Sequence, residues 1–477
     1  MNKIFGKKKL IKDISANTLQ TLITQVFGLV IFYLTSKYLS KNDFGELNWS
    51  MAVGSTLIAV GSLGLDLVFV KRIASGDDIL QISGIHFFHT LIVGIILSLA
   101  VYGIQIFVPS FTESHPIFFL IFLNLAIANI ANSFKLCLNG LESYKQLAIL
   151  ALCSNTFKLF CIIVLFVSRE FTITYVILAY TATSLLEFGL GYILMNRSVS
   201  ARVKPLLKVY EYKYFILESL PQLGVVLFDS ALARIDWILL GILSTSVITA
   251  EYSFAYKVFE LSKLPLLIIS PVLLTRFTKL LGNNKQLTEN HVRAIDVFLK
   301  IELFIIMFIP IILVCCWTPL IDYFTDNKYG AVNEINYMIL ALCVPLICAI
   351  NFLWTLGFVQ GQLKTIMFIT IIVSVLNIVC NAVLIPFYGS MGSSFSFLAC
   401  TCIQLVLYFV FINHEQVKLN MVSVLTGTIT AAASIIVARL LSNNIIFTSV
   451  LALLSYTMLA MVTRQVSVKQ LKQVMQE

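Results

Sequence analysis

Two charged side chains interrupt an apolar stretch near the middle of the chain. Arg234 and Asp236 lie in ALARIDWILLG, residues 231–241, and the flanking sequence is apolar as well. If this stretch crosses a membrane, each charge costs about 2.5–3.5 kcal/mol at the bilayer centre, so it must face a cavity or a partner. A guanidinium binds phosphate bidentately, and a carboxylate accepts hydrogen bonds from cations. The pair therefore indicates a polar site inside a membrane.

The depth of each charge predicts which of them can meet. A span that begins near residue 247 places Lys257 about 15 Å below its outer end, in the same layer as Arg234 and Asp236. The latter two are two positions apart, about 200° around a helix, so they cannot pair well with each other. We therefore expect Asp236 to pair with Lys257 and Arg234 to face the cavity.

The other charges expected at membrane depth extend this assignment. The expected cavity cations are Arg234, Lys257, Lys263 and Lys158. The expected structural or coupling carboxylates are Asp236, Asp229, Glu187 and Glu260. Lys158 and Glu187 are expected at similar depth, where they could pair, and the spacing of Lys257, Glu260 and Lys263 lets them partly neutralise one another. The alternative for all of these residues is a set of buried ion pairs that lock helices together.

Polar stripes predict a hydrophilic lining for the same cavity. Asn17, Thr21 and Thr24 recur at helical spacing in the first apolar run, and Asn377 and Asn381 do so in the eleventh. Such side chains can line a wet cavity, and they can also form hydrogen bonds between helices. Both interpretations stay open on the sequence alone.

Long apolar runs along the chain predict the membrane-spanning helices that would hold these polar residues in place. Of the 477 residues, 59% are hydrophobic and 12% charged, and runs long enough to cross about 30 Å of hydrocarbon recur from about residue 15 to 462. We predict an all-α polytopic membrane protein of about fourteen spans, without a large soluble domain. Short loops hold most of the Lys and Arg, 24 of 33 on one side against 5 on the other. This bias predicts cytoplasmic termini and explains the net charge of +9 without nucleic-acid binding.

A weak internal repeat predicts the domain organisation. An offset of 205 aligns Glu46 with Glu251 and Lys71 with Arg276. Two six-helix lobes in the same orientation follow, with a cavity between them, as in transporters. The expected parts are an N-lobe over 1–195, a cytoplasmic linker over 196–214, a C-lobe over 215–412, and two further helices with a tail over 413–477.

Several weaker signals point to structure rather than chemistry. His86 and His89 are three positions apart, and we expect polar packing there rather than a metal site. Asp66 precedes Lys71 and Arg72, and we expect an interfacial salt bridge among them. The ten cysteines lie in or beside apolar runs and read as buried apolar residues. We expect no metal and no cofactor, and the absence of a Walker motif argues against direct use of ATP.

The sequence resembles a transporter family in several stretches. LSKNDFGELNWSMA with GSLGLDLVFVKRIA resembles the start of the polysaccharide-export branch of the multidrug/oligosaccharidyl-lipid/polysaccharide exporter superfamily. ESLPQLGVVLFDSALARIDWILLG with AEYSFAYK resembles its seventh and eighth helices. The resemblance covers the chain and implies a flippase of the Wzx type that works by alternating access, with cationic residues lining the cavity. Arg234, Asp236, Tyr252 and Lys257 fall on the family's pattern.

The resemblance also implies a cargo and a location. Members of this type are thought to flip an undecaprenyl-diphosphate-linked oligosaccharide repeat unit, of O-antigen or capsule type, to the outer leaflet of the bacterial cytoplasmic membrane. The expected partners are this substrate, membrane lipids, a coupling ion (proton or sodium), a polysaccharide polymerase and a chain-length regulator. The alternatives are a multidrug or cation antiporter, a peptidoglycan-precursor flippase and a membrane polysaccharide polymerase. The last needs a larger external loop than the longest one here, about 318–333, and we do not expect an enzyme.

Overall fold

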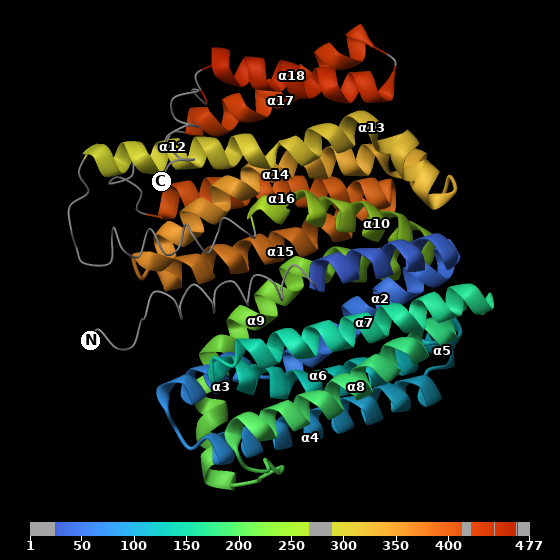
Figure 1. Cartoon of the computed structure of the whole chain (residues 1–477), viewed down its shortest axis with the longest axis vertical. Coiled ribbons are helices and arrows are strands. Elements are labelled where there is room, and N and C mark those ends of the chain that lie inside the picture. The colour runs from blue at the N-terminus through green and yellow to red at the C-terminus, as the bar shows by residue number, and fades with distance from the viewer. Residues whose placement is uncertain (1–23, 267–288, 413–420, 443, 464, 466–477) are drawn as a thin grey trace. The chain divides into compact units, whose positions relative to one another are not determined.

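A computed structural model describes residues 24–266, 289–412, 421–442, 444–463 and 465. Helices joined by short turns and loops make up these residues, without a strand among them. The chain divides into two compact units, Met1–Gly241 and Ile242–Glu477. Figure 1 labels the helices of both.

The first unit contains nine helices within the described residues. A helix over residues 24–38 is followed by α2 (Lys41–Gly61), α3 (Leu65–Ser75), α4 (Ile79–Phe107), the short α5 (Pro109–Ser114), α6 (Phe118–Gly140), α7 (Tyr144–Ser168), α8 (Ile173–Val199) and α9 (Val209–Leu243). In Figure 1, α4, α6 and α8 run side by side, and α6 packs against both neighbours. The cluster of Phe69, Phe134, Met195 and Phe215 buries side chains from α3, α6, α8 and α9 together.

The second unit is arranged around α14. Its helices within the described residues are α10 (Ser246–Ser262), α12 (Glu289–Ile306), α13 (Phe308–Thr325), α14 (Gly330–Val359), α15 (Leu363–Tyr388), α16 (Ser390–Phe411), α17 (Met421–Leu441) and α18 (Ile445–Val462). The apolar part of α14 is 72% buried, the highest share of any span, and this helix packs against α10, α12, α13, α15, α16 and α17. Tyr337 fixes the packing, because it stacks on Trp317 with 4.2 Å between centroids and its hydroxyl lies 2.8 Å from Ser262 Oγ.

The helices confirm a multi-pass membrane protein. Ten helices of the described residues are long and apolar enough to span a bilayer, or eleven if α2 and α3 form one bent span. Of the expected fourteen spans, the first and the eighth extend into 1–23 and 267–288, which lie outside the described residues, and the expected seventh, α9, is not among these candidates. The all-α fold is confirmed, and the count of fourteen stays a prediction.

A sharp break divides the second span. α2 and α3 meet at 54°, and Leu63 (φ 51°) and Gly64 (φ 73°) between them adopt left-handed backbone conformations. Gly64 also packs against the backbone of α9, where a Cβ atom would lie 2.6 Å from Leu223 N and 2.9 Å from Ser219 O. Only glycine satisfies both conditions, because it lacks the Cβ that would clash and adopts positive φ without strain.

The division of the chain differs from the lobe boundaries expected from the repeat. Those boundaries place residue 215 at the start of the C-lobe, whereas the compact units place nearly all of α9 with the first unit. The contacts explain this. Glu218 of α9 accepts a 2.8 Å hydrogen bond from Arg72 Nε of α3, and Phe215 is buried in the first unit's core. Near the other end of α9, Trp49 of α2 donates a 3.2 Å bond to Ile238 O.

Candidate functional site

Arg234 and Asp236 occupy different environments on α9. The Arg234 guanidinium lies over the Trp237 ring, 4.4 Å from its centroid, and the arginine is partly exposed. Asp236 is only 3% exposed, and its Oδ1 accepts a 2.9 Å bond from the Trp237 backbone N–H. Trp237, one turn along from Arg234, therefore limits the directions in which the guanidinium can point. The partly exposed arginine and the buried aspartate agree with the expectation that they lie on different faces.

A second set of charges lies on α6, α7 and α8. The Lys158 ammonium lies 3.6 Å from the centroid of the Tyr180 ring, on its face. Glu187 forms an ion pair with Lys135 Nζ at 3.1 Å and interacts electrostatically with Lys158. The expected Lys158–Glu187 ion pair is therefore replaced by Lys135–Glu187. The reason is that α8 packs more closely on α6 than on the sequence neighbour α7.

In the second unit, the charges of α10 neutralise one another locally. Lys257 Nζ pairs with Glu260 Oε2 at 2.7 Å, one turn apart on the same helix, which confirms the expected neutralisation. Lys263 Nζ lies 4.4 Å from the centroid of the Phe259 ring, a cation–π contact. The expected Asp236–Lys257 pair joins residues of the two units and stays a prediction.

The predicted polar stripes have different outcomes. Asn381 is fully buried; it bonds to Asn377 O at 2.9 Å and accepts a 2.9 Å bond from Ser393 of α16. The bond from Ser393 connects α16 to α15, whereas the bond to Asn377 lies within α15. Thr24 is exposed at the start of the described chain. Asn17, Thr21 and the side chain of Asp229 lie outside the described residues, so their predicted roles stay predictions.

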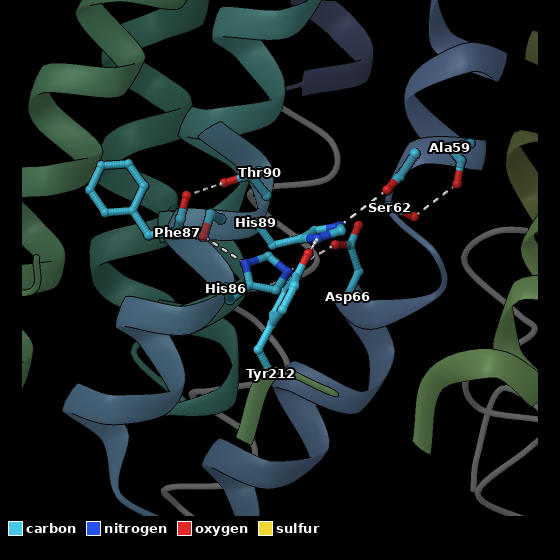
Figure 2. Close-up of polar contacts among 10 residues, drawn as sticks. Ala59, Ser62, Asp66, His86, Phe87, His89, Thr90 and Tyr212 are labelled. Atoms are coloured by element: carbon cyan, nitrogen blue, oxygen red, sulfur yellow. Dashed lines mark hydrogen bonds and ion pairs between the residues drawn. The ribbon is translucent and has the colours of Figure 1, made fainter. Parts of the chain in front are cut away.

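The two histidines form a buried polar network at the break between α2 and α3 (Figure 2). His86 bonds through Nε2 to Asp66 Oδ1 at 3.1 Å and through Nδ1 to Ser133 Oγ at 2.7 Å. His89 Nε2 lies 3.1 Å from Gly61 O, and its Nδ1 lies 2.9 Å from the Tyr212 hydroxyl. A carbonyl oxygen only accepts, so Nε2 of His89 donates and the neutral ring accepts from Tyr212 through Nδ1. Polar packing, as expected, is confirmed.

The expected salt bridge of Asp66 with Lys71 and Arg72 is wrong. Asp66 pairs with His86, whereas Lys71 and Arg72 both pair with Glu218 of α9. The bend before α3 is the physical reason, because it turns Asp66 toward α4, as Figure 2 shows. Two histidines of α4 thus hold both sides of the break. His89 bonds to the carbonyl of Gly61 at the end of α2, and His86 bonds to Asp66 in the first turn of α3.

Sequence reasoning missed one acidic side chain at membrane depth. Glu302 lies near the end of α12, inside the apolar segment Asp296–Thr325, and is 2% exposed. Neither of its carboxyl oxygens has a hydrogen-bond partner among the described residues. The signal was present in the sequence, since IELFIIMF contains one acid in an otherwise apolar run.

Comparison with known proteins agrees with this architecture. The family model described as "Polysaccharide biosynthesis protein" matches residues 10–280, more than half of the chain. A search of curated proteins gave no match. Among solved structures, the lipid II flippase MurJ in an inward closed conformation superposes with a TM-score of 0.75 at 13% identity, over 94% of this chain and 98% of that one. An inward-facing multidrug resistance MATE family transporter superposes with a TM-score of 0.64 at 13% identity, over 85% and 98%.

Proposed function

This chain belongs to the polysaccharide biosynthesis protein family, whose structural neighbours are flippases and transporters, and from that premise we propose its cargo. We propose that it flips an undecaprenyl-diphosphate-linked oligosaccharide repeat unit, of O-antigen or capsule type, from the inner to the outer leaflet by alternating access. The cargo combines a diphosphate, a polar glycan and a long apolar tail. Each of these parts needs a different environment within the membrane.

Arg234 is the observation that carries this proposal. It lies on α9, the expected seventh span, is partly exposed, and its guanidinium lies over the Trp237 ring. A guanidinium replaces the water around a diphosphate with charge-assisted hydrogen bonds, which are roughly twice as strong as neutral ones. Lys158, Lys257 and Lys263 add positive charge to the expected spans, and the Lys158 and Lys263 ammonium groups lie over aromatic rings.

The second unit also offers an apolar surface that suits the tail. A groove of about 380 Å³ is lined by α13, α14 and α17 through Ile311, Val314, Met338 and Ile435 with other apolar side chains. A polyprenyl chain suits such a groove because its lining is as apolar as lipid, so the tail loses little on moving from the bilayer into it. A polyprenyl chain thus has an environment there that a small cationic drug does not require.

A lipid-linked peptidoglycan precursor is the second candidate cargo. The overall fold shared with the lipid II flippase favours it, and its diphosphate would use the same cations. A fold shared at low identity does not choose between the two glycans, because specificity depends on the side chains of the site.

Transport in proteoliposomes tests the proposed function. The purified chain is expected to expose a fluorescent undecaprenyl-diphosphate-linked oligosaccharide to an impermeant quencher faster than protein-free vesicles do. The same lipid carrying a peptidoglycan-precursor headgroup serves as the competing substrate, and a fluorescent organic cation tests drug transport. Export of the cation without flipping of either lipid would contradict the proposal, and faster flipping of the precursor would favour the second candidate.

We also propose that both termini lie in the cytoplasm and that the membrane is the bacterial cytoplasmic membrane. The excess of Lys and Arg on one side of the expected spans supports this orientation. This orientation predicts that Lys328, after α13, faces outward and that Lys204, between α8 and α9, faces the cytoplasm. In intact cells an impermeant thiol reagent is expected to label Lys328→Cys and to spare Lys204→Cys, in a background without exposed native cysteines. Labelling of Lys204→Cys alone would reverse the orientation.

The proposal includes an energy source and partners. Export against a concentration gradient needs an ion gradient, of protons or sodium, since the sequence has no ATP-binding loop. A polysaccharide polymerase and a chain-length regulator are the proposed partners, because a flipped repeat unit must be polymerised outside.

A further inference from the structure

Glu302 is unlike the other well-buried acids of the described chain. Glu46, which is 5% exposed, accepts a 3.1 Å bond from Ser50 and lies 2.9 Å from His115. Asp236 accepts a backbone bond. Glu302 is 2% exposed, and both of its carboxyl oxygens lack a hydrogen-bond donor within the described residues.

Within the described residues, no cation forms an ion pair with Glu302. α12 packs against α13, α14 and α17. The titratable or charged groups on these helices are Cys315, Cys316, Asp322 and Tyr323 on α13, Glu334, Tyr337, Cys343 and Cys348 on α14, and Arg439 on α17. Of these groups, Cys348 on α14 is close enough to Glu302 for the two side chains to interact electrostatically.

The nearby cations are already engaged. Lys300, two positions before Glu302, pairs with Asp296 at 2.6 Å. Arg439 bonds to Val314 O at 2.8 Å and to Glu334 at 3.3 Å. The Tyr456 hydroxyl of α18 donates its hydrogen bond to Phe304 O at 3.4 Å and not to the Glu302 carboxyl.

An ionised carboxylate in this position is strongly disfavoured. Moving an isolated carboxylate into an apolar interior is so costly that the group takes up a proton instead. A metal cation is a poor alternative, because hard cations need about six oxygen ligands and the described residues contain no group of three or more His, Cys, Asp or Glu side chains that could hold an ion. Binding one proton converts the carboxylate to a neutral carboxylic acid and removes the charge without any further ligand.

We propose that Glu302 is a proton-binding site, protonated in this conformation, and that it releases and regains this proton when the transport cycle opens it to water. This second part rests on the proposed function and makes Glu302 the residue that couples a proton gradient to flipping. The bound species is a proton on one carboxyl oxygen, and no other bond forms or breaks.

Infrared spectroscopy tests the proton site independently of transport. The full chain at pH 7, in an alkyl maltoside detergent that lacks carbonyl groups, is expected to show the C=O stretch of a buried carboxylic acid. Glu302→Gln should lose this band. Glu334→Gln should keep it, because Glu334, unlike Glu302, pairs with Arg439 and accepts a bond from Thr318. A spectrum unchanged by Glu302→Gln would overturn the proposal. The thermal midpoint of Glu302→Gln should equal or exceed that of wild type, which excludes misfolding.

Transport under a pH gradient tests the coupling. Wild-type flipping in proteoliposomes is expected to accelerate when a pH gradient is applied, and Glu302→Gln, which remains neutral, should lose this acceleration. An equal response of Glu302→Gln and wild type would overturn the coupling role. If the wild type does not flip the oligosaccharide lipid at all, the proposed function fails, while the infrared result still decides the proton site.

Discussion

Replacing Arg234 by alanine is expected to reduce flipping of the oligosaccharide lipid by about 10- to 100-fold. Hydrogen bonds to charged groups contribute about 1.5–3 kcal/mol each, and this change removes the guanidinium that we propose contacts the diphosphate. Arg234→Lys should restore the charge without the planar fork and give an intermediate rate. Initial rates in proteoliposomes at equal protein content measure both variants.

The control for this prediction is another arginine-to-alanine change. Arg197, in the last turn of α8, is exposed and lies outside the proposed site. Arg197→Ala should flip at the wild-type rate. Equal rates for Arg234→Ala and wild type would remove Arg234 from the proposed cargo site. Equal losses in both variants would point to a general effect of lost positive charge.

Gly64→Ala is expected to destabilise the first unit by about 2–5 kcal/mol. A left-handed backbone costs a residue with a Cβ roughly 1–2 kcal/mol, and overpacking adds about 1–3 kcal/mol. The methyl group would lie 2.6 Å from Leu223 N and 2.8 Å from Gln222 C, and backbone cannot yield as a flexible side chain can. The measurement is the free energy of unfolding in mixed micelles.

Gly76 is a matched control within the same unit. It also has a positive φ, 88°, at the end of α3, but a Cβ there would meet nothing within 4 Å. Gly76→Ala should therefore cost only the backbone strain of about 1–2 kcal/mol. Equal losses for the two variants would mean that the close approach of α3 and α9 contributes nothing.

Some partners of the charged residues were predictable because they lie on one helix. Lys257 and Glu260 are three positions apart, and that spacing alone brings them together. The partner of Glu187 was not predictable in the same way. Lys135 and Lys158 both lie on neighbouring helices, and the choice between them depends on how closely α8 approaches each one.

The bend between α2 and α3 could likewise be predicted only in part from the sequence. The sequence GSLGLD predicts a turn, but not its angle or the helix that receives Asp66. The angle depends on Gly64 meeting the backbone of α9, more than 150 positions along the chain. The pairing of Asp66 with His86 follows from that contact.

The sequence by itself determined that this protein is an all-helical, multi-pass membrane protein with charges inside its expected spans. Apolar runs, their lengths and the charges within them are local properties, and the hydrocarbon thickness acts on each run separately. Tertiary structure alone decided which charges pair across helices and which buried acid of the described residues has no hydrogen-bond partner. Those outcomes depend on which helix faces meet, and the removal of Glu302 from water requires helices that are distant in sequence.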